Sequence, residues 1–577
     1  MQRHFQPLPW RAKGLSDSLD GSTAFNGAMA SLSNLIPDPT TAELWQCRPA
    51  AVQIAELPGG PWSSGFSPGF GFGAGTTGVI SALRVIGNTA YGLSNQADGY
   101  DHPFAYDLIN NVFLPITGVV SSPPGSQNIP TAQSPTGAWT PPIMDVIGSK
   151  LVVTHPGFAF TSFFIGWFDI SNPAAPAWSA GNITSTISGV PFTKVPIAVA
   201  QFYNRAYYIV NYNNQPVVIF SDILNPLTAN GVGGTITPVL TFGDNAPLTC
   251  LGQLRLFNQL GGIVQALIVF KGTSNIYQIT GDAAFTSSGV NTNFAGSPLV
   301  INAMNFATGT LAPLTLCSTP RGLAFVAPDG LRIIDFSANV SDPIGYDGQG
   351  VSAPFIFSAI PSRMCAACNG NVIRISTQST LSPTAAFQEF WYDIERKIWS
   401  GPHTFPAAVI QPYGNTFVMA AQGIVGRLWR SDAVQSAGST FVEAGATLGY
   451  SYTTTFLPDT DKLGNIHVSQ ALLTCALAAT VAPVTVSAID QNGRAIDSVM
   501  LSGTGGAAIW GQFNWGQAAW GVSSNALNPR RLAWHVPLVF SRGQFTVSGQ
   551  SASPVRLGAW HFRYKQLRYL TDVSAAA

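Results

Sequence analysis

The sequence predicts an all-β protein, with a β-propeller of six to eight blades and a separate β-rich platform domain. Three observations support this prediction. Amphipathic helical periodicity is nearly absent from the 577 residues. Short β-branched or aromatic runs recur instead, and each ends at Gly, Pro, Asn or Asp, which are the residues that form turns. A motif that precedes many of these turns also repeats at a spacing that suits propeller blades.

The repeated motif is an aromatic or apolar pair, followed by Asp or Ile and then by a polar turn. Its instances lie at residues 104–108, 167–170, 219–223, 276–279, 333–336, 391–394 and 428–432. Their mean step is roughly 54 residues, a little above the 40–50 residues of a four-stranded blade. Sheets packed radially about an axis bury faces that one sheet alone leaves exposed. Independent hairpins packed in a sandwich are the alternative interpretation.

Three segments are expected along the chain. Residues 1–70 form an N-terminal arm, residues 71–440 form the propeller, and residues 441–577 form a C-terminal β-domain. The apolar run at residues 471–489 is about long enough to span a bilayer, but Pro483 and the Val–Thr–Val alternation after it indicate two short strands. The first residues also lack the apolar core of a signal peptide. We therefore expect no membrane embedding.

The chain is unusually poor in charge, because Asp, Glu, Lys and Arg make up only 9 % of it, against roughly 25 % in ordinary soluble domains. The 27 basic residues balance the 27 acidic ones, so repulsion between copies is weak and assembly is favoured. No basic stretch indicates sequence-specific binding of nucleic acid, although a neutral wall would let DNA slide past. Six cysteines are too few for a disulfide framework and indicate a reducing cytoplasm.

Two short patterns resemble parts of metal sites. Cys365 and Cys368 have CxxC spacing, but no second pair or histidines stand near them in the sequence, so we interpret them as buried thiols. Asp459 and Asp461 resemble the start of a calcium loop, but the twelfth position is Gln470 instead of the bidentate Glu that such a loop requires. We expect no bound metal and no cofactor.

Catalytic signatures are missing as well, including GxSxG, the P-loop and a Gly-rich opening of a helix. Asp98, Asp101 and His102 form a polar cluster that we interpret as a solvated loop tip. Sialidase-type propellers repeat a Ser-x-Asp-x-Gly-x-x-Trp turn, which this chain lacks. We therefore expect no enzymatic activity.

Tryptophans are dense near the C-terminus, at Trp510, Trp515, Trp520, Trp534 and Trp560. Three roles fit such a cluster: packing in a core, anchoring a protein interface, or stacking on sugars. The sequence leaves all three open.

Two regions resemble the tail nozzle proteins of short-tailed phages, also called tail tubular protein B. In the first, an Asn-containing segment at residues 25–37 leads to the Arg-Pro pair within residues 47–50, like the opening of that family. The second is the propeller unit that ends at residues 390–400. The basic, aromatic finish at residues 560–564 is also similar.

The resemblance implies a virion structural protein that forms a homo-hexameric ring below the portal and a tail adaptor protein, contacts tail fibre proteins, and lets phage DNA pass non-specifically. The arm and the C-terminal β-domain would together form the platform. The protein would be assembled in the host cytoplasm and would reside in the virion tail. The family has no catalytic residues to carry over.

A ring interface needs aromatic and Arg anchors more than a charge network. The candidates are Arg48, Trp510, Trp515, Trp520, Arg530, Arg531, Arg563 and Arg568. The alternative function is an extracellular β-propeller that binds or cleaves glycans.

Overall fold

Strands account for nearly all regular structure in the computed structural model. It describes residues 6–10, 13–16, 28–39, 41, 44–57, 79–95, 100–117, 129–130, 140–185, 195–212, 214–230, 239–257, 262–281, 299–304, 307–345, 350–380, 387–421, 427–433, 440–457, 466–477, 483–502, 527–551 and 555–566. The helices of these residues are α1 (Ala353–Ile356) and the 3-10 turns η1 (Pro156–Phe160), η2 (Pro313–Thr315) and η3 (Pro361–Arg363). The all-β prediction is confirmed.

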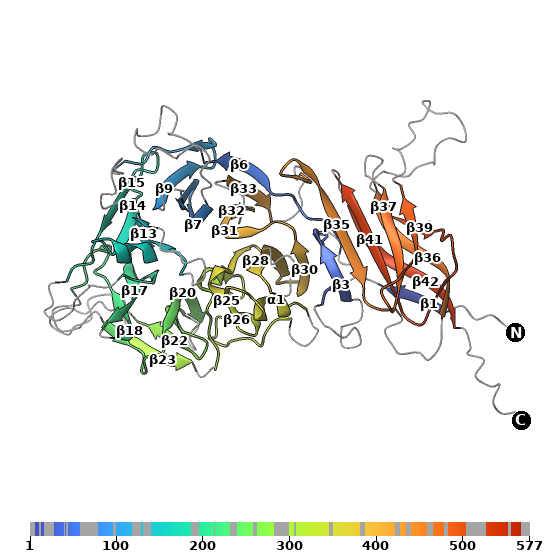
Figure 1. Ribbon diagram of the computed structural model, residues 1–577. Coiled ribbons are helices and arrows are strands. Elements are labelled where there is room, and N and C mark those ends of the chain that lie inside the picture. Colours follow the sequence, from blue (N-terminus) through green and yellow to red (C-terminus); the bar gives the residue numbers. More distant parts are fainter. Residues whose placement is uncertain are drawn as a thin grey trace, which may run out of the picture.

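Seven small sheets stand around one axis in chain order and form the blades of a propeller (Figure 1). Blade 1 holds β7 (Val79–Ile86), β8 (Thr89–Asn95), β9 (Tyr100–Asp107), β10 (Val112–Phe113) and β11 (Ile129–Pro130). Blade 2 holds β12 (Ile143–Ile147), β13 (Lys150–Thr154), β14 (Ile165–Asp169) and β15 (Ala177–Gly181). Blade 3 holds β16 (Ala198–Phe202), β17 (Arg205–Tyr212), β18 (Gln215–Phe220) and β19 (Val239–Thr241).

The remaining four blades follow the same antiparallel order. Blade 4 holds β20 (Leu248–Phe257), β21 (Ile263–Lys271), β22 (Asn275–Thr280) and β23 (Val300–Met304). Blade 5 holds β24 (Cys317–Thr319), β25 (Gly322–Ala327) and β26 (Gly330–Ile334). Blade 6 holds β27 (Cys365–Asn369), β28 (Val372–Gln378), β29 (Phe387–Asp393) and β30 (Ile398–His403). Blade 7 holds β31 (Ala407–Tyr413), β32 (Thr416–Ala421), β33 (Arg427–Asp432) and β6 (Val52–Glu56).

The repeated motif marks the end of the third strand of each blade, from β9 in blade 1 to β33 in blade 7. Where it contains Asp, the carboxylate holds the turn that follows. Asp393 Oδ1 accepts hydrogen bonds from the backbone N–H groups of Glu395 and Arg396, both at 3.0 Å. Asp335 Oδ1 accepts in the same way from residues 337 and 339. Asp recurs at several of these positions because its carboxylate can accept hydrogen bonds from the backbone N–H groups of a turn.

The ring is closed by a strand from the N-terminal side of the chain. β6 pairs antiparallel with β33 and so completes the last blade. β6 lies within the segment that the sequence predicted as an arm, which therefore contributes to the propeller. The first strands of successive blades contact one another around the whole ring, and β31 meets β7. Apolar side chains fill the spaces between blades, as where Phe270 of blade 4 and Phe325 of blade 5 have ring centroids 5.0 Å apart.

Two sheets of a β-sandwich lie beside blade 6 (Figure 1). One sheet has the order β39 (Asn528–Leu532), β36 (Ile466–Leu477), β42 (Val555–Gln566), β5 (Trp45–Cys47) and β4 (Leu35–Pro37), with β1 (Gln6–Trp10) beside β42 and β40 (Leu538–Phe540) beside β36. The other has the order β2 (Gly14–Leu15), β3 (Ala28–Ser33), β35 (Ala446–Thr454), β41 (Gly543–Ser551), β37 (Val484–Asp490) and β38 (Ala495–Leu501), with β34 (Val442–Glu443) beside β35. Both ends of the chain thus build each sheet.

A close backbone approach at Gly322, where β25 begins, gives a test of the blade geometry. Gly322 has φ +138°, and a Cβ atom there would overlap the carbonyl oxygen of Ile334. We expect Gly322→Ala to lower the free energy of unfolding by about 3 kcal/mol. Gly370 is the control, because its φ is +57° and a Cβ atom there would meet no other atom within 4 Å, so alanine should cost about 1 kcal/mol. Equal losses in urea unfolding would contradict this geometry.

Candidate functional site: the sandwich junction and the propeller axis

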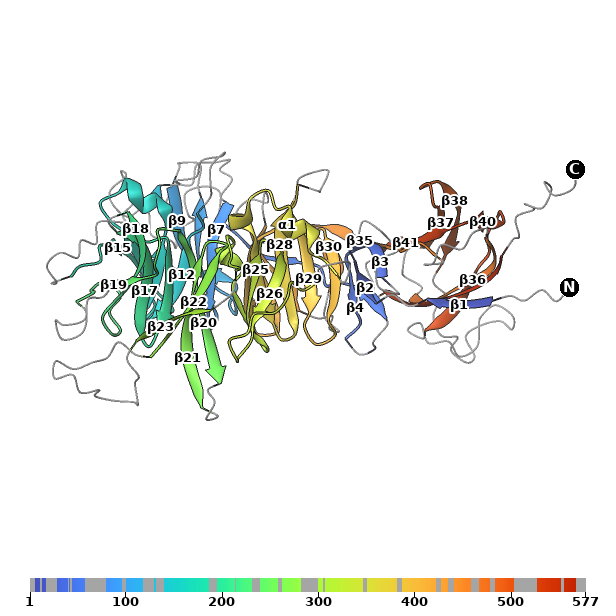
Figure 2. The same cartoon turned by 90° about the horizontal axis from the view of Figure 1, so that it is seen from below.

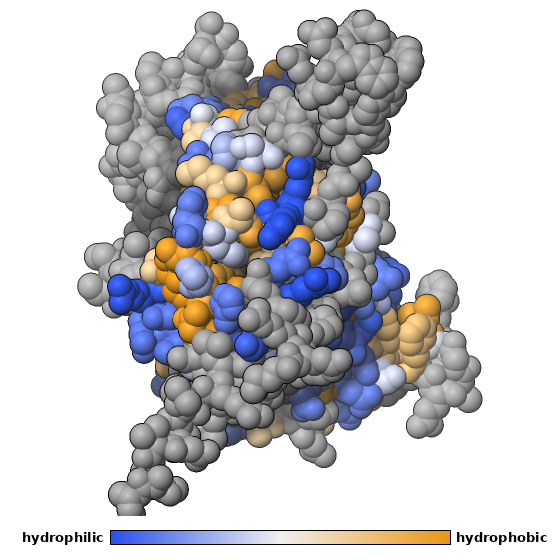
Figure 3. Space-filling model, turned by 90° about the vertical axis from the view of Figure 1, so that its right-hand side faces the viewer, coloured by the Kyte–Doolittle hydropathy of each residue, from blue (hydrophilic) through white to orange (hydrophobic). Residues whose placement is uncertain are grey.

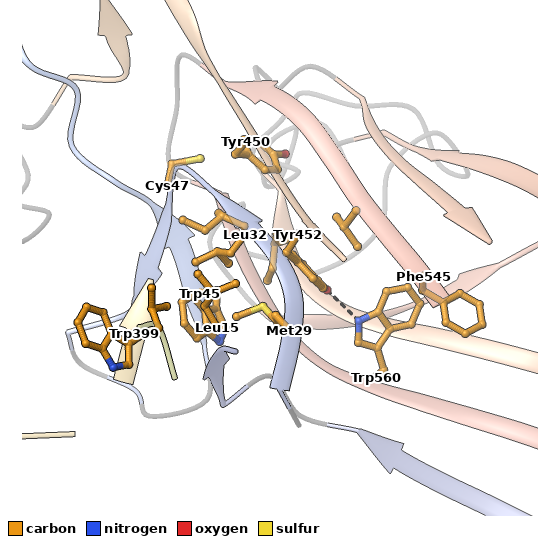
Figure 4. Packing of buried hydrophobic residues seen from close by; sticks show 14 of the residues in the cluster. Leu15, Met29, Leu32, Trp45, Cys47, Trp399, Tyr450, Tyr452, Phe545 and Trp560 are labelled. Carbon is orange, nitrogen blue, oxygen red and sulfur yellow. Dashed lines mark hydrogen bonds between the residues drawn. The ribbon is translucent and has the colours of Figure 1, made fainter. Parts of the chain in front are cut away.

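The propeller and the sandwich share one continuous apolar core. β30 of blade 6 contacts β2, β3 and β4 of the sandwich. Figure 4 shows Trp399 of β30 beside Leu15 and Trp45, with Tyr452 directed toward Trp560 farther into the sandwich. The indole Nε1 of Trp560 donates a hydrogen bond to the Tyr452 hydroxyl at 2.8 Å. Because the core runs through the contact, the two parts are held together by burial of apolar surface.

An ion pair, fully buried on the arginine side, lies at the edge of this core. Arg48 is fully buried, and its Nη1 and Nη2 donate to the two carboxylate oxygens of Glu443 at 2.9 and 2.8 Å. The carboxylate of Glu443 also accepts from the backbone N–H of Ala51 at 2.9 Å. Bidentate, charge-assisted pairs of this kind are strong and geometrically specific. This one joins the arm to the strand that opens the C-terminal part of the chain.

Asn34 extends the ion pair into a three-way junction. Its Oδ1 accepts from Arg48 Nε at 2.9 Å and from the backbone N–H of Thr404 at 3.1 Å. Its Nδ2 donates to the carbonyl oxygen of Gly449 at 2.7 Å. The arm, the end of blade 6 and β35 are therefore bound to one side chain. Asn34 adopts φ +53°, a left-handed conformation that Asn tolerates better than most residues.

Arg48 was expected at an interface between subunits, but its side chain is occupied inside the subunit. With no exposed surface and three hydrogen-bonding groups engaged, the guanidinium cannot also anchor a neighbouring copy. Its role is to join segments of its own chain. Its partner, Glu443, lies 395 residues away in the sequence. No local sequence pattern therefore indicates that the two residues pair.

Removal of one charge from this pair should be costly. We expect Glu443→Gln to lower the free energy of unfolding by about 3–5 kcal/mol, because the buried Arg48 guanidinium would lose its counter-charge. The matched control is Arg427→Gln, which breaks the exposed pair between Arg427 and Glu56, whose side chains are 36 % and 55 % exposed. That change should cost less than about 1 kcal/mol. Equal losses in urea unfolding would show that burial gives the junction pair no stability beyond that of the exposed pair.

A second buried pair lies between blades 6 and 7. Arg374 and Glu389 are both fully buried, and Nη2 of Arg374 lies 2.8 Å from the carboxylate. The guanidinium also stands over the rings of Trp391 and Phe417, at 4.3 and 4.9 Å from their centroids. His403 is packed against Trp391. Burial, together with the charges of Arg48 and Arg374, holds the pKa of His403 well below its usual value of 6.5.

The buried His403 makes stability depend on pH. Below pH 6.5 the unfolded chain binds a proton that folded His403 does not, so the free energy of unfolding should fall as the pH falls toward the lower folded-state pKa. One such proton corresponds to about 1.4 kcal/mol per pH unit. His403→Gln should lose less stability than the wild type between pH 7 and pH 5 in urea titrations. Parallel losses in both proteins would exclude His403 as the titrating group.

The first strands of the blades surround a cavity of about 430 Å³ on the propeller axis. Asp145 of β12 is the only carboxylate among its described lining residues. Its Oδ2 accepts from the backbone N–H of Gln201 at 2.6 Å and from Nε2 of Gln253 at 3.3 Å, and Arg84 lies 3.4 Å from Oδ1. The carboxylate thus ties four blades together. Its lone pairs are engaged, which suits a structural role better than proton transfer.

Asp101 and His102 do not form a solvated loop tip, which corrects that interpretation. Both lie on β9 and are buried. Asp101 Oδ2 lies 2.7 Å from His155 Nε2 and accepts from the Ser81 hydroxyl at 2.9 Å. His155 Nδ1 accepts from the backbone N–H of Gly157, so Nε2 carries the proton. Ser81 contacts Asp101 and not the imidazole of His155, so the serine has no general base beside it. The Asp101–His155 contact instead connects blades 1 and 2.

Cys365 and Cys368 both lie on β27, where residues three apart point to opposite faces of the strand. The two thiols therefore cannot face one ligand together. Burial raises the pKa of Cys368 to about 12, and such a thiol is a poor nucleophile and metal ligand. In the part of the chain that the structure describes, no three His, Cys, Asp or Glu side chains gather to hold a metal ion.

Several predicted site residues lie outside the described residues: Trp510, Trp515, Trp520, Arg568, Asp98, Asp459 and Asp461. Of the other tryptophans, Trp560 is core and Trp534 is half-buried. The apolar run at 471–489 supplies the end of β36 and most of β37. None of the described helices is both long and apolar enough to cross a membrane.

Three predicted interface arginines lie on one sandwich sheet. Arg530 and Arg531 are on β39, and Arg563 is on β42, where it pairs with Gln470 of β36. Arg531 and Arg563 are exposed. Figure 3 looks onto the sandwich end and shows apolar surface gathered in patches between hydrophilic side chains. Exposed apolar side chains in this part of the chain include Met500, at 73 % exposure, Leu527, Val536 and Val539.

No family model matches the chain, and no curated protein matches it. Among solved structures, it is similar to puromycin hydrolase at 12 % identity and a TM-score of 0.36, covering 70 % of this chain and 61 % of that one. This chain therefore spans less than two thirds of that enzyme. The Cps50 (Swd1) β-propeller domain of Myceliophteria thermophila matches at 13 % identity and a TM-score of 0.33, covering 67 % of this chain and all of that domain.

An exo-β-1,3-galactanase from Phanerochaete chrysosporium matches at 10 % identity and a TM-score of 0.25, covering 89 % of this chain and all of the enzyme. At these scores the matches carry no argument about activity. The class of the protein rests on its own sheets: a seven-bladed β-propeller inserted into a β-sandwich.

Proposed function

We propose that this protein is a virion structural protein, a subunit of the tail nozzle of a short-tailed phage. In this proposal it forms a homo-hexamer that contacts the tail adaptor and tail fibres and surrounds the path of the DNA. It is assembled in the host cytoplasm. The observation that carries the proposal is the construction of the sandwich, in which the strands before β6 and those after residue 441 share both sheets. Such a unit suits a platform from which the propeller projects.

The surface of the sandwich supports assembly. The exposed apolar residues Val536 and Val539 and the exposed arginines Arg531 and Arg563 belong to this part of the chain. Apolar patches flanked by Arg are typical of protein interfaces. Because the chain carries few charges and no net charge, electrostatic repulsion between copies is weak.

The axial cavity favours this role over the cleavage of glycans. Glycoside hydrolysis uses a pair of carboxyl groups on either side of the scissile bond. Among the described residues that line the cavity, Asp145 is the sole carboxylate, and its oxygens already accept hydrogen bonds from blades 3 and 4.

Cryo-electron microscopy of the concentrated full-length protein tests the proposal. We expect six-fold rings in which residues 441–577 make most of the contacts between copies and the propellers lie outside. Val539→Asp should abolish the rings because it places a charge in the interface, whereas Ile109→Asp, at a 60 % exposed position of the propeller, should leave them intact. Monomers at every concentration, or rings closed by propellers alone, would contradict the proposal.

A further inference from the structure

A long hairpin projects from one face of the propeller. It consists of β20 and β21 of blade 4, and Figure 2 shows it extending beyond the neighbouring blades. Along β20, Leu254 and Leu256 are buried, whereas Arg255 and Phe257 are exposed. Arg255 is paired in register with the exposed Gln265 of β21. The projecting part therefore has one packed face and one amphipathic face open to solvent.

The open face forms one wall of a groove of about 620 Å³. A second wall is the turn between β16 and β17 in blade 3, with Tyr203 and Asn204 in left-handed conformations. The third is the turn between β24 and β25 in blade 5. Phe336 also lines the groove, and its carbonyl oxygen accepts from the backbone N–H of Phe257 at 2.8 Å. The groove thus lies among three blades, which hold its walls in place.

Polar side chains supply much of the lining, which also includes Phe202, Leu254 and Phe336. Gln201, Asn204, Gln253 and Gln265 line the groove with Ser318, Thr319 and Tyr203. Arg255 is the one charged side chain among the described lining residues, and no carboxylate lies with it. Within the described chain, the side chains of Arg255, Gln265 and Asn204 make no hydrogen bond or ion pair. Each is available to a ligand.

We propose that this groove binds an oligosaccharide that carries a carboxylate. Amide side chains offer donors and acceptors together, which matches the hydroxyl groups of a sugar. A guanidinium recognises a carboxylate through two parallel hydrogen bonds. Tyr203 lines the groove, and the exposed Phe257 lies beside it against the lining residue Phe336. Their rings offer apolar faces for a sugar ring.

Other ligand classes fit the lining less well. A nucleic-acid backbone needs several cations in a row, and this groove has one. A peptide held by its side chains needs apolar pockets, whereas the exposed lining here is mainly polar. A site for acidic glycans does not depend on the proposed nozzle role, because the groove lies on the propeller and not on the sandwich.

Isothermal titration calorimetry of the full-length protein tests the site, with tetragalacturonate and sialyllactose as acidic probes and maltotetraose as the neutral probe. We expect at least one acidic probe to bind about tenfold or more tightly than maltotetraose. The two acidic probes distinguish a uronic acid from a sialic acid as the source of the carboxylate.

Substitutions of residues that line the groove test whether the binding occurs there. Arg255→Gln should weaken binding of the acidic probe by about tenfold or more, and Gln265→Ala should weaken it by a smaller factor. Arg494→Gln is the matched control, because Arg494 is exposed on a turn of the sandwich, and it should bind like the wild type. Unchanged thermal unfolding would confirm that each variant is folded. Absence of binding to both acidic probes, equal binding of the neutral probe, or full binding by Arg255→Gln would each overturn the proposal.

Discussion

The ion pair between Arg48 and Glu443 is the interaction on which the arrangement of the molecule depends. It joins the N-terminal arm to the C-terminal segment at the place where the propeller begins and ends. Asn34 adds a hydrogen bond to the end of blade 6, so the pair restrains three segments at once. Burial of Arg48 makes the pair costly to break, since its charge would be left buried without a partner.

The propeller and the sandwich are each held together by different interactions. The propeller repeats one antiparallel unit, and β6 closes the ring with main-chain pairing. The sandwich is built from distant segments, and its core continues into blade 6 through Trp399 and Trp45. Because β6 follows the sandwich strands β4 and β5 along the chain, closure of the ring and completion of the sandwich depend on the same stretch of chain. This coupling explains why segments from both sides of the propeller in the sequence build the sandwich.

The sequence predicted features that depend on local repetition. Asp393 and Asp335 each hold the turn after the third strand of a blade, and the spacing of the motif that contains them predicted the propeller. Contacts between distant residues left no such pattern. The pairing of Arg48 with Glu443 and the bridge from Asp101 to His155 required the fold to be known. The groove beside Arg255 was missed as well, because its walls come from three blades. The only local sign of it was an arginine at the end of a strand with alternating polar and apolar residues.

The shared core and the ion pair at the junction should hold the propeller and the sandwich as one rigid unit. Pulsed electron paramagnetic resonance tests it most directly, with spin labels at Asn110→Cys in blade 1 and Asn492→Cys in the β37–β38 turn, both exposed positions. The half-buried Cys317 and Cys368 would be replaced by serine. We expect one narrow distance distribution in the parent protein and a broader one after Glu443→Gln. A broad distribution in the parent protein would contradict this expectation.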